Sequence, residues 1–326
     1  MEYIIPNYYK AFHCIAGRCR HSCCMGWEID IDEATHALYQ GISGAFGARL
    51  SESIEVDGDG AHFRLDARER CPFLNRENLC DIILTLGEDA LCQICRDHPR
   101  FRNFFSDRTE IGLGLCCEAA GELLLGSAEK MQLVPLEGTE NATDTKLTEE
   151  EQRFFEFREQ VFAVLQNRAQ RIDARLQAVL TLCRTALPQK SPAQWAEIFL
   201  RLERLDDAWT KNLQELQAAP PTSLLLILPK ETDIFFEQLA VYFSYRHLAG
   251  ALEDGSLAAR AAFSMLGVQM ISYFCKLYFG KHDDLPLAAV AEFARLYSSE
   301  IEYSQENMDT LLSILHGECA DFAGDS

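Results

Sequence analysis

Thiol side chains dominate the chemistry available to the first third of this chain. The sequence has 13 cysteines, and ten of them lie between Cys14 and Cys117. They form one group of four and three pairs: Cys14, Cys19, Cys23 and Cys24, then Cys71 and Cys80, Cys92 and Cys95, and Cys116 and Cys117. Thiolates bind soft metal ions and iron–sulfur clusters, they pair as disulfides, and a single activated thiolate is a nucleophile. Such clustering argues against the single nucleophile.

Disulfide bonds suit this chain poorly, because nothing in its first residues directs it to an oxidising compartment. The start MEYIIPNYYKAF has an early acid and a proline, and it lacks the basic and apolar regions of a secretory signal. No segment approaches the roughly 18 uninterrupted apolar residues of a membrane span. We therefore expect a cytoplasmic protein with no membrane partner, whose thiols are kept reduced.

Metal binding explains the density of thiols best. Zinc sites favour Cys-x2-Cys pairs with four ligands in total, and only Cys92 and Cys95 have that spacing. Irregular clusters of cysteines with prolines close by, here Pro72 and Pro99, are more typical of iron–sulfur ligation. We expect a 4Fe–4S cluster, with zinc as the alternative.

A cubane cluster needs four thiolates, so the ten cysteines exceed the need. Cys23 lies in the densest group, Cys71 precedes a proline, and Cys92 and Cys95 present two sulfurs from one turn, so these four are the favoured ligands. The substitutes are Cys19, Cys24 and Cys116, followed by Cys14, Cys80 and Cys117. Three histidines beside cysteines are alternative ligands: His13, His21 and His98. The remaining cysteines lie in apolar helical patterns, which predicts core positions: Cys183, Cys275 and Cys319.

The charge of the chain restricts its partners. With 30 Lys and Arg against 50 Asp and Glu, the formal net charge is −20 at pH 7. Nucleic acid attracts basic surfaces, so we expect no nucleic-acid partner. An acidic surface suits a basic or lysine-bearing partner, and it also serves solubility.

The elements that must hold these thiols are short and irregular. Residues 1–135 predict a small cysteine-rich α+β domain, with a hairpin around Asp57–Gly60 and a few short helices. Residues 136–147 are polar and predict a linker. Residues 148–326 are helical in pattern, beginning with Thr148 and Glu151 at the spacing of a capping box. We expect a mainly α protein whose second domain, 148–326, is an α-helical bundle.

Several cysteine blocks together resemble a known family. The blocks YYKAFHCIAGRCRHSCCMGWEIDID, CPFL, LCQICRDHPRF and GLCCEAA occur in this order and resemble the flagellin lysine N-methylases, bacterial proteins with a cysteine-rich zinc- or iron-chelating domain. The resemblance is strong over residues 1–125 and looser through the helical half, including FFEQLAVYFSYRHL. It implies methyl transfer from S-adenosylmethionine to lysine ε-amines of flagellin, with a 4Fe–4S cluster involved.

A methyl donor with a sulfonium group would need a site of its own. Aromatic faces attract cations, so four tyrosines of the helical half are candidates to line it, and core packing is their other interpretation: Tyr242, Tyr245, Tyr273 and Tyr278. The sequence identifies no catalytic residue. The alternative function is a non-catalytic zinc- or iron-binding, or redox-sensing, protein-interaction module. Binding of S-adenosylmethionine would distinguish the two.

Overall fold

The computed structural model describes residues 2–27, 29–58, 60–137 and 146–323, with side chains described up to residue 317. Contacts divide the chain into two compact units. One, here called the helical unit, contains Met1–Phe12, Phe101–Cys116 and Ala120–Ser326; the other, the thiol unit, contains His13–Arg100 and Cys117–Ala119. The units interleave along the chain, whereas the predicted segments 1–135, 136–147 and 148–326 follow chain order and stay a prediction. Most of the predicted linker, residues 138–145, lies outside the described residues.

The thiol unit is built from short elements around a small core. Its helices are α1 (Glu33–Gln40), α2 (Gly44–Ser53), α3 (Asp81–Leu86) and α4 (Gln93–Asp97), with the 3-10 turns η2 (Ala16–Arg18) and η3 (Glu88–Ala90). Three strands form an antiparallel sheet in the order β2-β4-β3: β2 (Asp30–Ile31), β3 (Ile54–Val56) and β4 (Ala61–Phe63). Val56 lies opposite Ala61, so the predicted hairpin is formed. This mixture of short helices and strands confirms the expected α+β character.

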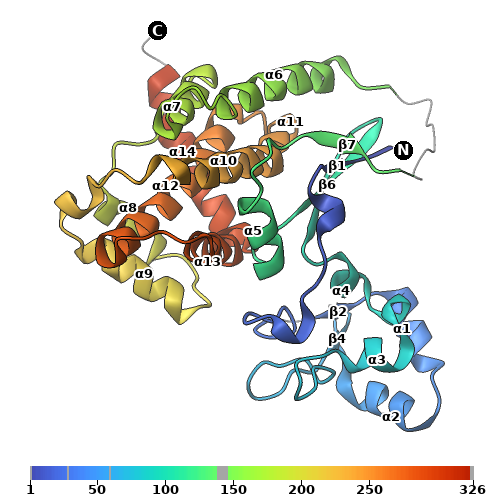
Figure 1. Ribbon diagram of the computed structural model, residues 1–326. Helices are drawn as coiled ribbons and strands as arrows, with labels where there is room; N and C mark the ends of the chain where they lie inside the picture. Colours follow the sequence, from blue (N-terminus) through green and yellow to red (C-terminus); the bar gives the residue numbers. More distant parts are fainter. Residues whose placement is uncertain (1, 28, 59, 138–145, 324–326) are drawn as a thin grey trace. The chain divides into compact units, whose positions relative to one another are not determined.

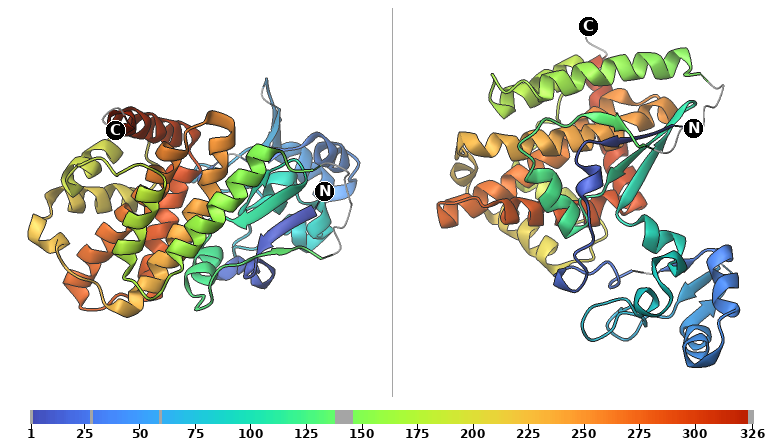
Figure 2. Two further views of the ribbon diagram at one scale, coloured as in Figure 1. Left: turned by 90° about the horizontal axis from the view of Figure 1, so that it is seen from above. Right: turned by 45° about the vertical axis from the view of Figure 1, so that its right-hand side comes forward.

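The helical unit contains a sheet that joins distant parts of the chain. Its strands are β1 (Glu2–Pro6), β5 (Arg100–Phe104), β6 (Arg108–Leu113) and β7 (Leu133–Pro135), in the order β5-β6-β1-β7. β1 runs parallel to β6 and antiparallel to β7, and Figure 2 shows the dark-blue start of the chain beside these strands. The β5–β6 turn is closed by a hydrogen bond from Phe105 N to Arg108 O, 2.9 Å.

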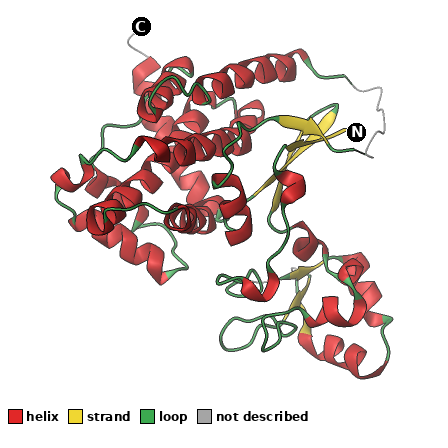
Figure 3. Cartoon of the chain, in the orientation of Figure 1, coloured by secondary structure: helices red, strands yellow, loops and turns green. Residues whose placement is uncertain are grey.

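Helices form the rest of this unit, which confirms the predicted bundle (Figure 3). They are α5 (Glu118–Leu125), which begins at the boundary between the units, α6 (Glu149–Leu165), α7 (Ile172–Leu182), α8 (Pro192–Phe199), α9 (Asp207–Ala218), α10 (Asp233–His247), α11 (Ala251–Asp254), α12 (Leu257–His282), α13 (Leu287–Tyr297) and α14 (Gln305–Ala323). The predicted capping box begins α6, where Thr148 Oγ1 accepts from Glu151 N at 3.1 Å. A π-helical turn, η7 (Ser298–Glu302), follows α13.

Helix α12 is the centre of the bundle. It contacts α7, α9, α10, α13 and α14, and Figure 1 shows it running beside α10. Among the described helices it alone has the length and apolar composition to cross a membrane, and 67% of that apolar stretch is buried inside the protein. Its burial among the other helices explains its apolar composition, because a helix that is apolar all round is a core helix.

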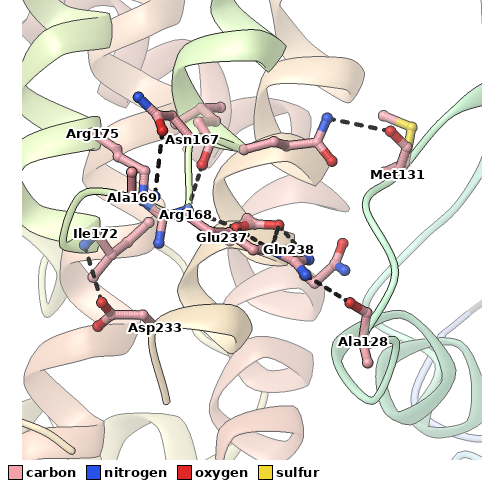
Figure 4. A network of polar contacts seen from close by, with 12 residues as sticks. Ala128, Met131, Asn167, Arg168, Ala169, Ile172, Arg175, Asp233, Glu237 and Gln238 are labelled. Carbon is pink, nitrogen blue, oxygen red and sulfur yellow. Dashed lines mark hydrogen bonds and ion pairs between the residues drawn. The ribbon is translucent and has the colours of Figure 1, made fainter. Parts of the chain in front are cut away.

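Buried ion pairs tie the helices to one another and to the sheet. The Glu237 carboxylate on α10 accepts hydrogen bonds from Arg168 Nη2 at 2.8 Å and Arg175 Nη1 at 2.6 Å (Figure 4). Arg158 on α6 pairs with Glu110 on β6 through two 2.6 Å bonds, and both side chains are almost fully buried. A pair of this kind fixes the position of α6 on the sheet.

Candidate functional site

Five thiols belong to the core of the thiol unit, and we call them the core thiols. Cys71 and Cys92 are buried there, and Cys24, Cys80 and Cys95 pack against the same cluster. Cys92 is the N-cap of α4, so Cys95 lies in the first turn of that helix. The two sulfurs are 3.3 Å apart. The two sulfurs therefore converge, and their role as metal ligands stays a prediction.

The chain segments that carry the other core thiols meet through backbone contacts. Cys71 N donates to Cys24 O at 2.9 Å, and Cys80 is paired with Leu74 in a short antiparallel bridge. The neighbour of Cys71 in the core is therefore Cys24, whereas Cys23 is exposed. The Cys23 thiol forms a hydrogen bond with Cys24, which lowers the pKa of Cys24 to about 7 and raises that of Cys23.

Four thiols lie outside this core: Cys14, Cys19, Cys23 and Cys117. Glu118 organises this part of the unit, since its carboxylate accepts from Arg20 N at 2.9 Å and from Arg20 Nε at 2.8 Å. The Cys19 thiol also donates to it at 3.7 Å. Burial and the charge of Glu118 contribute to raising the pKa of Cys19 to about 11.

The remaining cysteines belong to the helical unit. Cys116 lies there beside Tyr303. Burial is the main cause of the raised pKa of Tyr303, and Cys116 contributes to it. Cys183 and Cys275 are buried in the core, as expected. The side chain of Cys319 lies outside the described residues. Ten of the described cysteines, those other than Cys116 and Cys117, are free thiols.

The thiol unit offers a donor set made of sulfur, which is the ligand chemistry of zinc and of iron–sulfur clusters. Burial is the main cause that raises the pKa of Cys71 to about 12, and the nearby Cys24 contributes. A metal must therefore displace a proton to bind there. Within the part of the chain that the structure describes, no three His, Cys, Asp or Glu side chains are arranged to hold a metal ion. The Cys92–Cys95 pair supplies two convergent sulfurs.

The helical unit contains a pocket of about 510 Å³, within the size range of small-molecule sites. Strand β5, the start of α6, the end of α10 and η7 contribute to its walls. The lining residues are Phe101, Arg102, Asn103, Phe104, Phe105, Thr148, Glu150, Glu151, Arg246, His247, Ala249, Gly250, Leu252, Glu253, Arg260, Glu302, Gln305 and Met308.

A buried carboxylate forms the polar floor of this pocket. The side chain of Glu302 is 0% exposed. It accepts hydrogen bonds from Tyr242 Oη at 2.9 Å and His247 Nε2 at 2.6 Å, and it forms an ion pair with Arg246, whose Nε lies 3.3 Å away. Burial would raise the pKa of Glu302, but the Arg246 charge and the His247 hydrogen bond outweigh burial and lower it to about 2. Glu302 is therefore an ionised acceptor at neutral pH.

Two aromatic rings make cation–π contacts with Arg246. Its guanidinium carbon lies 4.9 Å from the centre of the Phe101 ring and 4.8 Å from that of Tyr303, and its Nη1 donates to Tyr242 Oη at 2.8 Å. These two cation–π contacts and the Tyr242 hydrogen bond restrain the guanidinium. Glu302 itself ends the π-helical turn η7, a type of helical irregularity that is frequent at functional sites.

The four predicted donor-site tyrosines do not gather in one place. Tyr242 binds Glu302 beneath the pocket, and Tyr245 is buried against the Phe101 ring. Tyr278 lines a second cavity of about 310 Å³ between α9, α12 and α13, and Tyr273 lies half-buried on α12. Their role in donor binding stays a prediction.

Sequence reasoning missed the charged residues of the pocket floor. Arg246 and His247 directly follow Tyr245, one of the predicted tyrosines, and Glu302 lies 55 residues beyond His247. The available signal was the pair of basic residues, Arg246 and His247, at the C-terminal end of α10. Their carboxylate partner is invisible locally, because only the fold brings η7 to α10.

Comparison with known proteins gives a distant and partial relationship. The chain is 27% identical over 134 residues to a protein of Salmonella typhimurium named lysine-N-methylase, and the match covers 39% of this chain and 33% of that protein. A protein of Salmonella muenchen named flagellar biosynthetic protein FliU is 27% identical over 134 residues, covering 79% of its length. The match thus spans about a third of the length of the curated methylase. No protein-family model and no solved structure matches the chain.

Proposed function

We propose that this protein transfers methyl groups from S-adenosylmethionine to lysine ε-amines of a protein substrate, flagellin, in the cytoplasm. The observation that carries the proposal is the distant homology to the lysine-N-methylase, together with the likeness to FliU. The pocket in the helical unit supports it. Four carboxylates line it, at Glu150, Glu151, Glu253 and Glu302, beside the guanidinium groups of Arg102, Arg246 and Arg260. A carboxylate is the partner that an ammonium or a sulfonium group requires.

Incubation of the full chain with S-adenosylmethionine and the flagellin of its own cell tests this proposal. Intact-mass and peptide mass spectrometry should find methyl groups added to flagellin lysines, and none should appear when the donor is left out. If flagellin stays unmethylated while the donor also fails to bind in equilibrium dialysis, the non-catalytic binding module becomes the better description.

We further propose that the thiol unit binds a 4Fe–4S cluster, with zinc as the alternative. The core thiols support this, because they share one small core and include two sulfurs 3.3 Å apart. Cys24, Cys71, Cys92 and Cys95 would hold the group. The reserve candidates are Cys80 and the four thiols outside the core, Cys14, Cys19, Cys23 and Cys117. When bound, the cluster would contribute ligand-binding energy to folding of this unit.

Anaerobic purification followed by iron, sulfide and zinc determination tests the metal. Iron and sulfide in roughly equal amounts, with absorbance near about 400 nm, are expected for a cubane cluster. Stoichiometric zinc without iron would replace the cluster by a zinc site. The short distance between the Cys92 and Cys95 sulfurs also favours a second function, redox sensing through a reversible disulfide. This function requires both sulfurs to be free of metal in the purified protein.

A further inference from the structure

His247 and Glu302 form a hydrogen-bonded dyad at the floor of the pocket in the helical unit. The His247 side chain is 6% exposed and the Glu302 side chain 0% exposed, with Nε2 and Oε1 2.6 Å apart. Both residues line the pocket. A histidine oriented by a buried carboxylate is the arrangement that many enzymes use for a general base.

The chemistry of the dyad fixes the tautomer of the imidazole. Glu302 is ionised and can only accept, so the proton shared with His247 belongs to Nε2. The other ring nitrogen, Nδ1, then carries the lone pair. Nδ1 has no hydrogen-bond partner within the described parts of the chain. It is also not fully buried. It is therefore the ring nitrogen available to a pocket ligand.

Charges from three elements surround this imidazole. Glu302 on η7 contacts the imidazole directly, and Arg246 precedes His247 on α10. Arg260 Nη1 on α12 donates to the His247 backbone oxygen at 3.4 Å. Burial, followed by the two arginine charges, outweighs Glu302 and lowers the pKa of His247. The imidazole is consequently neutral at neutral pH and can accept a proton.

The walls of the pocket fit a long alkyl chain that ends in an ammonium group. Phe104 on β5 is 74% exposed and offers an apolar face to methylene groups. The carboxylates of Glu150, Glu151 and Glu253 line the same space, as do the guanidinium groups of Arg102, Arg246 and Arg260. A lysine side chain combines these two features.

We infer that the pocket binds the lysine side chain of the protein substrate and that His247 Nδ1 removes its proton; this inference rests on the proposed methyl transfer. The proton moves from the ammonium nitrogen to Nδ1, and Glu302 stabilises the resulting imidazolium. The amine lone pair then forms the new N–C bond while the C–S bond of the sulfonium breaks. Sulfur keeps that electron pair as a neutral thioether, the product nitrogen becomes a methylammonium, and His247 releases its proton to solvent.

The test is the pH dependence of methyl transfer by His247→Gln, which keeps Glu302 and Arg246 in place. At about pH 7.5 the variant should be roughly 10²- to 10⁴-fold slower, the range of general-base catalysis. Its rate should rise about tenfold per pH unit toward the lysine pKa of roughly 10.4, because bulk solvent then supplies the neutral amine. The wild-type rate should change little over the same range.

The control is His316→Gln, on the exposed face of α14, which should retain the wild-type rate and pH profile. A His247→Gln variant that keeps the wild-type rate, or that loses the same factor at every pH, overturns the inference. Circular dichroism of each variant distinguishes misfolding from a loss of catalysis in a folded protein. If His247→Gln misfolds, His247→Asn with the same pH series takes its place.

A binding measurement separates this inference from the proposed function. The chain has eight histidines, so the imidazole NMR signals of His247 can be assigned by their loss from the spectrum of His247→Gln. Capped lysine, Nα-acetyl-lysine methylamide, should shift these signals, and capped glutamate should not. Such a shift without any methyl transfer would refute the proposed function and keep the amine site. Methyl transfer without such a shift would refute the amine site alone.

Discussion

Phe104 is an aromatic residue that remains 74% exposed while lining the pocket. Phe104→Ala should raise KM for the protein substrate about 5- to 10-fold, the loss of roughly 1 kcal/mol of apolar contact with a lysine stem. The turnover number should change less than about twofold, because the contact is the same before and during the reaction. Steady-state kinetics with flagellin measures both.

The matched control is Leu225→Ala, since Leu225 is 77% exposed and does not line the pocket. This variant should keep the wild-type KM and turnover. A Phe104→Ala enzyme with normal KM, or with reduced turnover and normal KM, would show that substrate does not pack on Phe104.

The Cys23–Cys24 doublet gives a second prediction for single residues. Cys24→Ser should reduce bound iron strongly, because Cys24 packs in the core beside Cys71, and serine is a poor ligand for a soft metal. Cys23→Ser should reduce it less, since Cys23 is exposed. Iron content after anaerobic purification measures both, with Cys275→Ser as the buried control that keeps full iron.

More iron lost from Cys23→Ser than from Cys24→Ser would restore Cys23 as the ligand favoured by the sequence. The sequence alone favoured Cys23 because it could place the doublet in the densest cysteine group but could not order its two members. Adjacent residues point in different directions, and which direction is the core depends on β2, β4 and the Cys71 segment, which lie further along the chain.

At the scale of elements, the buried Arg158–Glu110 pair joins α6 to β6. Arg158→Met should lower the free energy of unfolding by about 3 to 5 kcal/mol, because it leaves the Glu110 carboxylate buried without a partner. Arg158→Met combined with Glu110→Leu should recover most of that loss, since a buried ion pair is often replaced by apolar side chains at little cost. Urea unfolding followed by tryptophan fluorescence gives the three values.

The double variant decides what the pair contributes. If it is as unstable as Arg158→Met alone, the methionine packing and not the stranded carboxylate causes the loss. Arg64→Met, at an exposed ion pair with Glu55, is the control and should change stability by less than about 1 kcal/mol.

Helices of the second half were predictable, and the sheet that supports them was not. Period-3.6 apolar patterns and the capping box at Thr148 and Glu151 identify α6 directly from local sequence. Strand β1 pairs with β6 and β7, more than 100 residues away, and no local pattern specifies a partner at that distance. The dyad of His247 and Glu302 was hidden for the same reason, because α10 and η7 meet only in the folded chain.

At the scale of the whole molecule, the two units differ in what holds them together. Among the described residues, the hydrophobic core of the thiol unit has ten buried members, and two of these are cysteines. The helical unit instead buries a large apolar cluster that includes Trp195 and Trp209. A small core supplies little stability by itself, so the metal that we propose for the thiol unit should stabilise that unit far more than the helical unit.

Trp27 makes this dependence measurable, because the other two of the chain's three tryptophans lie in the helical unit. Its Nε1 donates to Cys23 O at 2.6 Å, so its fluorescence reports the thiol unit. Subtracting the melting curve of Trp27→Phe from that of the wild type isolates this signal. Removal of metal by a chelator should lower the Trp27 transition by at least about 5 °C, which corresponds to roughly 1 kcal/mol in a small unit. The transition reported by Trp195 and Trp209 should move by less than about 2 °C. Equal shifts of both transitions, or a Trp27 transition that ignores the chelator, would contradict a thiol unit stabilised by metal.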